Sequence, residues 1–369
     1  MKKKINLAII GGSFDSTIGN VHLKSLLATG NYEIICGFFS RSKSKNYQNS
    51  IQYNIKQNKV YNNLSKLILK ERNNFDIALV LTPPNTRYEI YKKLIQNNID
   101  IISEKPIEGS FTNAKKTFKL LEGKKNFFVC TYNYLGYPSI MEIKPLIKKK
   151  IGKVLNFVME MPQQAFVYKK SRPKKWRTKD LKIPNLHLDL ASHLLSLIIY
   201  FFNEYPREIM SFGSNQINPK ILDNNFTWLK FKRFVGSLWF SKNSNGERNQ
   251  ISIRIYGTKG SIKWKHSDPE NIIFSDNNGN IEIINRLSAK KEFISKDNLY
   301  TYSAGHPNGF LDGFVNIYQK IYKLYSKKNK VNTPPYILNL KENLNIISIL
   351  DTMHHSSKKN IWHKTKIYY

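Results

Sequence analysis

The sequence predicts an α/β protein: a doubly wound parallel sheet, then a C-terminal α/β domain with a large, mostly antiparallel open sheet. Apolar runs alternate with helical patterns as far as residue 131, the order that a parallel sheet with crossover helices requires. Beyond residue 206, β-type runs follow one another between turn signals. At 369 residues the chain exceeds one ordinary core. We therefore expect domains at 1–131 and 132–369, with C-terminal helices able to pack back on the first.

Elements of the first domain follow from short apolar runs and the residues that bound them. The run at residues 4–10 leads into a glycine-bearing turn and a helical pattern that Gly30 closes. Pro83 and Pro84 stop the third apolar run, and the next residues can cap a helix. We expect strands at residues 4–10, 33–39, 75–81, 100–103 and 126–131, and helices at 20–29, 63–71, 86–97 and 110–121.

The second domain is predicted to open with a helix and a strand on either side of Gly152. A mostly helical, apolar segment follows, and turns rich in glycine and asparagine then separate the β-type runs. We expect strands at residues 153–161, 208–213, 226–231, 236–240, 250–256, 261–265 and 272–275, and helices at 138–149, 187–200, 307–325 and 338–356.

Charge and cysteine content limit the classes of function. The formal net charge of +33 fits a nucleic-acid or anionic membrane surface, but the lysines are spread along the chain, so we favour solvated faces. Cys36 and Cys130 lie in apolar runs and are expected to be buried thiols in a reducing, cytoplasmic compartment. The N-terminus lacks the pattern of a signal peptide, and no apolar run is long enough to span a bilayer.

The turn at residues 11–19, G-G-S-F-D-S-T-I-G, lies between a predicted strand and a predicted helix. Small residues let the backbone approach a dinucleotide pyrophosphate, and the helix N-terminus stabilises its charge. Ser13 interrupts the strict G-x-G-x-x-G spacing, so the turn alone is a weak signal. The second strand ends without an acidic residue for a ribose hydroxyl. Ser40 and Arg41 can instead receive a 2′-phosphate, which slightly favours NADP, unless Arg41 is one more cation in a cation-rich chain.

The segment 100–106, D-I-I-S-E-K-P, reads as a short buried strand that delivers Glu104 and Lys105 to its C-terminal edge. Ligands of open α/β sheets bind just outside that edge. A lysine fixed there beside a carboxylate can protonate or deprotonate a substrate oxygen. For a lone E-K-P triplet, an ordinary surface lysine is the better interpretation. The proton-transfer role of Lys105 is therefore preferred only because of the motifs elsewhere in the chain.

A second cluster consists of His187, Asp189 and His193. On a helix, Asp189 and His193 share a face, with Cβ atoms about 6 Å apart. The carboxylate can orient the imidazole, which exchanges a proton near neutral pH. On spacing alone, a packed histidine ranks first, proton transfer second and a metal site third, because the local sequence of a metal signature is missing.

Together these motifs resemble the glucose–fructose oxidoreductase / inositol dehydrogenase (Gfo/Idh/MocA) family over nearly the whole chain. E-K-P followed by D-x-x-x-H at this distance is specific, and the order of further motifs adds to it: I-I-G-G-S-F-D-S-T-I-G, T-P-P-N-T, T-Y-N-Y-L-G-Y-P, W-R-T, I-Y-G-T-K-G-S-I-K-W and G-H-P-N-G-F. The resemblance implies a Rossmann domain and a C-terminal α/β domain whose open sheet often forms an oligomer interface. It also implies hydride transfer between NAD(P) and a hydroxyl carbon of a sugar, inositol or sugar derivative.

The resemblance assigns roles to individual residues. Lys105 and His193 are the implied proton-transfer pair at the reacting hydroxyl, where a developing alkoxide needs a cation within reach. Asp189 helps to position substrate and imidazole, and no metal is implied. Candidate substrate contacts are Trp176, Arg177 and His306. Candidate cofactor contacts are Gly11, Gly12, Ser13, Phe14, Ser16, Ile18, Ser40, Arg41, Thr82, Pro83, Asn85, Glu104, Lys105 and Asn133.

Some positions depart from the family pattern. Asp15 stands where similar relatives tend to carry glycine, which places a negative charge near the pyrophosphate. Arg87 stands where the T-P-x-x-x-H pattern has histidine, Ala191 replaces a glycine, and Ser196 replaces an aspartate. The departures bear on the substrate class and on cofactor affinity.

Three functions are therefore compared. The leading hypothesis is an NAD(P)-dependent oxidoreductase of a small polyhydroxylated substrate, forming a homo-oligomer (dimer or tetramer) without a specific nucleic-acid or membrane partner. The first alternative is an NAD-dependent glycoside hydrolase of the same fold. The second is a basic nucleic-acid-binding module, which rests on the net charge of +33 alone.

Overall fold

The computed structural model describes residues 3–40, 42–169, 180–288, 303, 305–306, 309–327 and 336–368. The chain divides into two compact units, Met1–Gly136 with Phe310–Leu344 and Tyr137–Gly309 with Asn345–Tyr369. Segment 310–344 is thus counted with the N-terminal sheet. The predicted division into domains at 1–131 and 132–369 stays a prediction.

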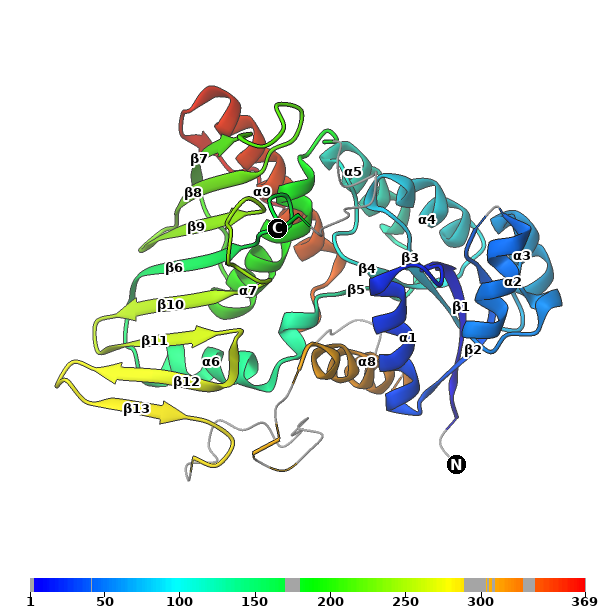
Figure 1. Cartoon of the computed structure of the whole chain (residues 1–369), viewed down its shortest axis with the longest axis horizontal. Coiled ribbons are helices and arrows are strands. Elements are labelled where there is room, and N and C mark those ends of the chain that lie inside the picture. Colours follow the sequence, from blue (N-terminus) through cyan, green and yellow to red (C-terminus); the bar gives the residue numbers. More distant parts are fainter. Residues whose placement is uncertain are drawn as a thin grey trace. The chain divides into compact units, whose positions relative to one another are not determined.

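The first unit is built on a five-stranded sheet in the order β2-β1-β3-β4-β5, with every pairing parallel (Figure 1). This confirms the doubly wound parallel sheet. The residues of β3 and β4 are buried throughout, because helices cover both faces, which explains their unbroken apolar runs. The strands are β1 (Ile5–Gly11), β2 (Tyr32–Phe38), β3 (Ile77–Leu81), β4 (Asp100–Glu104) and β5 (Phe128–Thr131).

Helices of the first unit begin at polar caps. Ser16, Asn63 and Ser110 each accept a hydrogen bond from a backbone N–H of the helix that follows. The helices are α1 (Thr17–Thr29), α2 (Lys43–Gln52), α3 (Leu64–Glu71), α4 (Arg87–Gln96), α5 (Phe111–Leu121) and α8 (Phe310–Ser326), with short 3-10 turns η1 (Gln57–Lys59), η2 (Pro84–Thr86) and η3 (Asn133–Gly136).

Helix α8, although far along the chain, packs beside α1 (Figure 1). The Tyr32 hydroxyl donates to the carbonyl of Tyr318 at 2.6 Å, and the Tyr322 hydroxyl donates to that of Lys3 at 3.0 Å. These hydrogen bonds tie α8 to β2 and to the residues just before β1.

The second unit is built on a nine-stranded sheet in the order β13-β12-β11-β10-β6-β9-β8-β7-β14 (Figure 1). The β6–β9 pairing is parallel and the others are antiparallel, as the predicted mostly antiparallel sheet requires. The strands are β6 (Val154–Pro162), β7 (Glu208–Ser214), β8 (Asn224–Lys230), β9 (Val235–Ser241), β10 (Ser252–Gly257), β11 (Gly260–Lys265), β12 (Asp268–Asp276), β13 (Ile281–Ile284) and β14 (His363–Lys364).

Helices α6 (Pro138–Lys149) and α7 (Ser192–Phe202) pack on strands of this sheet, and α9 (Leu340–Lys359) runs from the first unit into the second. Along β8, Thr227 and Leu229 are buried while Phe226 and Trp228 are exposed, so one sheet face is covered and the other is open. Among the described residues, no helix is both long and apolar enough to cross a membrane.

Candidate active site

The turn between β1 and α1 is held in a close backbone fold. Gly11 and Gly12 have φ angles of +84° and +66°, a region that favours glycine. A Cβ atom on Gly19 would lie 2.5 Å from the carbonyl oxygen of Gly12, so only glycine lets α1 approach the turn this closely. The strand–turn–helix context predicted for a pyrophosphate is therefore present, with backbone N–H groups at the start of α1. Residues on it predicted to contact the cofactor are Gly11, Gly12, Ser13, Phe14, Ser16 and Ile18.

Asn49 of helix α2 braces this turn and was not found from the sequence. It is fully buried; its Oδ1 accepts from the N–H of Phe14 at 2.7 Å, and its Nδ2 donates to Ser13 Oγ at 3.2 Å. Asp15 points to Lys45 of the same helix, 3.6 Å away, with both side chains about half exposed. An exposed pair at that distance contributes little to stability.

The end of β2 is shaped by Asn46. Its Oδ1 accepts from the N–H of Ser40 at 3.1 Å, and its Nδ2 donates to the carbonyl of Ser40 at 2.9 Å. Arg41 lies outside the described residues. The predicted 2′-phosphate contact of Ser40 and Arg41 thus stays a prediction.

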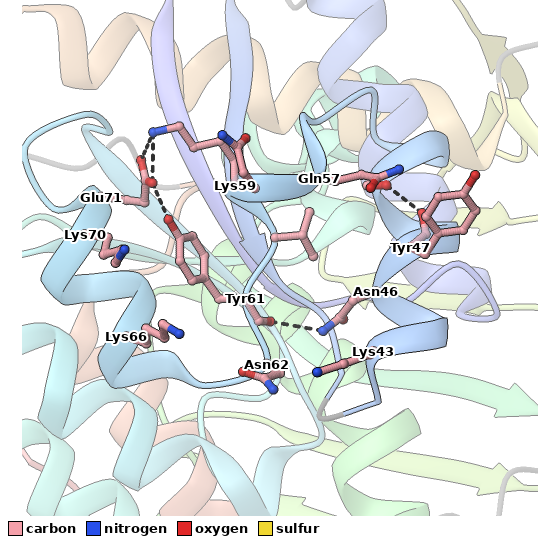
Figure 2. Close-up of a pocket in the computed structure, with 13 residues that line it drawn as sticks. Lys43, Asn46, Tyr47, Gln57, Lys59, Tyr61, Asn62, Lys66, Lys70 and Glu71 are labelled. Carbon is pink, nitrogen blue, oxygen red and sulfur yellow. Dashed lines mark hydrogen bonds and ion pairs between the residues drawn. The ribbon is translucent and has the colours of Figure 1, made fainter.

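A pocket of about 820 Å³ lies between α2, η1 and α3 (Figure 2). Lys59 and Tyr61 both bind the buried carboxylate of Glu71, with the ammonium 2.8 Å from Oε2. Lys43, Lys66 and Lys70 give the rim a positive charge, but all are exposed. Its described lining includes none of the residues predicted for the active site. We therefore do not place the reaction there.

Glu104 and Lys105 stand at the C-terminal end of β4, as predicted. The Glu104 carboxylate is buried and receives hydrogen bonds from Thr131 Oγ1 at 2.8 Å and from His22, whose Nε2 is 2.9 Å away. Burial alone would raise the pKa of Glu104, but His22 and the charges of Lys105 and Arg87 hold it below its ordinary value. The carboxylate is therefore fixed and charged directly beside Lys105.

Arg87 clamps the backbone around Lys105. It is 2% exposed; its Nε donates to the carbonyl of Thr82 at 2.8 Å, and its Nη1 donates to those of Glu104 and Pro106, which flank Lys105. The residue that departs from the family pattern thus ties the ends of β3 and β4 together through the fork geometry of a guanidinium.

Two candidate cofactor residues have polar atoms available for a ligand. Thr82 Oγ1 and Asn133 Nδ2 are buried and lack a hydrogen bond among the described residues. Buried polar atoms are rarely left unsatisfied unless a ligand or water completes them. Both follow strand ends at the carboxyl edge of the sheet, where dinucleotides bind. The residues present therefore fit a nicotinamide dinucleotide; Pro83 and Asn85 follow Thr82 on the same loop.

The second cluster begins with a π-helical turn, His187–Ala191, and continues as α7. The prediction of a helix is confirmed, but the π turn replaces its first regular turn; such turns are common at functional sites. His187 is fully buried against Phe240 and His354, and burial lowers its pKa to about 3. His187 is thus a neutral packing residue, and the described residues contain no group of three or more potential metal ligands.

Asp189 and His193 flank the end of that turn. Asp189 is partly exposed, and its Oδ2 lies 2.6 Å from Nζ of Lys242, which is 3% exposed. His193 is buried with 8% exposure. Lys242 follows β9, has no recognisable motif, and was not found from the sequence.

The predicted substrate contacts are mostly not described. Trp176 and Arg177 lie outside the described residues. His306 is exposed, and its carbonyl accepts a hydrogen bond from Arg286 at 2.5 Å. Substrate binding by these residues stays a prediction.

The fold and the glycine-bearing turn between β1 and α1 together define a nucleotide-binding α/β enzyme. Residues 5–133 match the family model described as "Oxidoreductase family, NAD-binding Rossmann fold", and residues 140–263 match "GFO/IDH/MocA C-terminal domain". The protein is an oxidoreductase with an NAD-binding Rossmann domain. Because the two matches together span most of the chain, it belongs to the Gfo/Idh/MocA family.

Known relatives cover the chain at low identity. An uncharacterised oxidoreductase of Bacillus subtilis, YfiI, is 20% identical over 346 residues, 89% of this chain and 88% of the relative. Levoglucosan dehydrogenase of Pseudarthrobacter phenanthrenivorans is 24% identical over 213 residues, 51% of this chain and 54% of that protein. The structure of an inositol dehydrogenase homolog from Azotobacter vinelandii, complexed with NADH and myo-inositol, is 17% identical with a TM-score of 0.89, covering 99% of this chain and 98% of that one.

Proposed function

We propose that the protein transfers hydride between a nicotinamide dinucleotide and a hydroxyl carbon of a sugar, inositol or sugar derivative. The observation that carries this proposal is Lys105, which follows a buried, charged Glu104 at the cofactor edge of the sheet. Relatives support the substrate class: one is named for levoglucosan, and another is complexed with myo-inositol. They give no support to the glycoside hydrolase alternative, since they are named as dehydrogenases.

In this proposal the chain's own residues handle the proton. Bound NAD(P) supplies the hydride acceptor, or the donor in reverse. Lys105 donates a hydrogen bond to the oxygen of the reacting hydroxyl and stabilises its developing negative charge. His193 takes up the proton, and Asp189 orients the substrate and the imidazole. The bond between carbon and hydrogen breaks as the carbonyl forms.

Cofactor preference is the finer part of the proposal. The described end of β2 presents Ser40 and carries no acidic residue for a ribose hydroxyl, which favours NADP slightly over NAD. Titration of protein fluorescence with NADH and with NADPH tests this directly. Tighter binding of NADH would contradict the preference for NADP and leave the enzyme class untouched.

A substrate panel tests the activity. Sugars, inositols and nucleotide sugars would be incubated with each cofactor, and absorbance of the reduced nicotinamide would be followed. We expect turnover with at least one polyol and a loss of roughly a hundredfold or more in Lys105→Ala. Lys24→Ala, which removes an exposed lysine of α1, is the matched control. Equal rates in wild type and Lys105→Ala would remove Lys105 from the mechanism.

The open face of the second unit's sheet supports a homo-oligomer, dimer or tetramer. Phe212, Phe226, Trp228 and Val235 are between 42% and 53% exposed on or beside neighbouring strands, and soluble monomers rarely leave a large apolar patch open. Light scattering would measure the molecular mass, with Trp228→Glu expected to lower it. A wild-type monomer would contradict the proposal. A nucleic-acid or membrane partner is not part of it, and a cytoplasmic location is consistent with two buried free cysteines.

A further inference from the structure

We propose that Lys242 is a positioning residue of the reaction, acting through the carboxylate of Asp189. This inference rests on the proposed function, since it assigns Asp189 a role in hydride transfer. It concerns one residue pair within the second unit, Lys242 and Asp189, 53 positions apart in the sequence.

The backbone of Lys242 is fixed on both sides. It follows Ser241, the last residue of β9, and its N–H donates to the carbonyl of Asp223 at 2.7 Å. Its own carbonyl accepts from the N–H of Phe166 at 2.8 Å. A backbone held this way leaves only the side-chain torsions to place the ammonium.

The side chain is enclosed. Only 3% of it is exposed, and Nζ lies 5.5 Å from the centre of the Phe166 ring. Its 2.6 Å contact with Asp189 Oδ2 is in the range of a strong charge-assisted hydrogen bond. An ammonium withdrawn from water in this way requires a countercharge, and Asp189 supplies it.

The carboxylate side of the pair is equally specified. Asp189 lies in the middle of the π-helical turn His187–Ala191, and its neighbours Leu188 and Leu190 are buried. π turns of this kind are frequent at functional sites, and here the Lys242 ammonium binds one oxygen of the carboxylate. With Oδ2 held by Lys242, the position of one carboxylate oxygen is fixed before any substrate arrives.

Asp189 and Lys242 therefore have different roles in this proposal. Asp189, with one oxygen bound by the Lys242 ammonium, serves as a hydrogen-bond acceptor, while proton transfer is left to other groups. In this proposal Lys242 has no separate task at the substrate, and its contribution passes through Asp189. Replacing Lys242 should therefore lower kcat/KM only in an enzyme that retains Asp189.

A double-mutant cycle in the full-length enzyme tests this. Values of kcat/KM would be measured for wild type, Lys242→Met, Asp189→Asn and the double variant. We expect Lys242→Met to lose roughly ten- to a hundredfold, because small displacements of a catalytic group have effects of that size. The double variant should be no slower than Asp189→Asn alone. Lys242→Arg should recover part of the activity, as it keeps the charge.

Controls separate positioning from folding. Lys230→Met breaks an exposed ion pair with Glu208 in the same sheet and should leave kcat/KM unchanged. Circular dichroism and NADH titration report whether each variant folds; if Lys242→Met does not, Lys242→Arg and Lys242→Gln carry the comparison. The positioning role of Lys242 would be overturned if the losses in kcat/KM of the two single variants multiplied in the double variant, or if Lys242→Met kept full activity. The proposed function would stand in either case. A wild type that oxidises no polyol would remove the proposed function, and this role with it.

Discussion

The Nε2 atom of His22, in the first helix, lies 2.9 Å from the carboxylate of Glu104, at the end of the fourth strand. The other ring nitrogen of His22 is 2.5 Å from the hydroxyl of Tyr318 in α8. A buried chain of hydrogen bonds thus links α8, α1 and β4 and ends beside Lys105. Buried polar networks of this kind stabilise a structure only when every member is satisfied.

Replacing His22 by leucine should destabilise the protein by about 3 kcal/mol or more, because Glu104 keeps a buried charge without its partner. His22→Gln, which can still donate to the carboxylate, should cost less. Since the folded pKa of Glu104 is below its ordinary value, its stabilising contribution is present at neutral pH and is lost as pH falls through the folded pKa. The difference in the free energy of unfolding between wild type and His22→Leu, measured with urea, should therefore become smaller at acidic pH.

Tyr318→Phe is the control for this series, because it removes only the hydroxyl that meets His22. We expect a smaller loss, about 1 kcal/mol, typical of one buried hydrogen bond. If His22→Leu were no less stable than Tyr318→Phe at neutral pH, the charge of Glu104 would not depend on His22.

Much of the fold could be predicted because its strands are short apolar runs. Helix α2 could not, since the face it buries is polar: Asn46, Asn49 and Ser50 are buried there by hydrogen bonds rather than by apolar contact. Strands β13 and β14 were missed as well; β13 exposes most of its residues, and β14 is only two residues long.

Some residues of the candidate site could likewise be predicted from the sequence, and others could not. Lys105 and Asp189 were predicted as site residues because a local motif surrounds each. Lys242 was not, because its partner lies 53 positions away and nothing in the local sequence marks the contact. Arg87 was noticed as a departure from a pattern, but its hydrogen bonds to the carbonyls beside Lys105 required the structure. Arg41, Trp176 and Arg177 lie outside the described residues.

Arg87→Met should lower kcat/KM by roughly tenfold or more, because the strand ends beside Lys105 lose their clamp. Lysine offers a point charge in place of a fork, so Arg87→Lys should recover little. Steady-state kinetics would measure this, with Arg72→Met, on the exposed end of α3, as the control. Arg87→Met with normal kinetics but lower stability would show that the clamp serves folding alone.

Asp15→Asn should tighten the binding of NADH by about two- to fivefold at low salt. The substitution removes a negative charge, about half exposed, from the turn that is expected to hold the anionic pyrophosphate, and like charges repel. Salt screens exposed charges, so the gain should shrink at high ionic strength. Fluorescence titration at two salt concentrations measures the effect, with Glu33→Gln as a control of equal charge change. A gain that persists in high salt would point to a steric cause.

The pH dependence of stability should reveal Glu108, which is fully buried and whose Oε2 lacks a hydrogen bond among the described residues. Burial raises its pKa from 4.5 to about 8, and the Thr117 hydroxyl and the Arg87 charge oppose this only in part. Between these values the folded chain holds a proton that the unfolded chain has lost, so this group lowers the free energy of unfolding as pH rises.

Glu108→Gln imitates the protonated carboxyl and should escape that fall. Relative to wild type, the variant should gain stability from pH 5 towards pH 8, on the order of 4 kcal/mol. Urea unfolding at several pH values measures this, with Glu122→Gln on the exposed end of α5 as the control. Parallel curves for wild type and Glu108→Gln would mean that the carboxyl is already ionised, or solvated, in the folded protein.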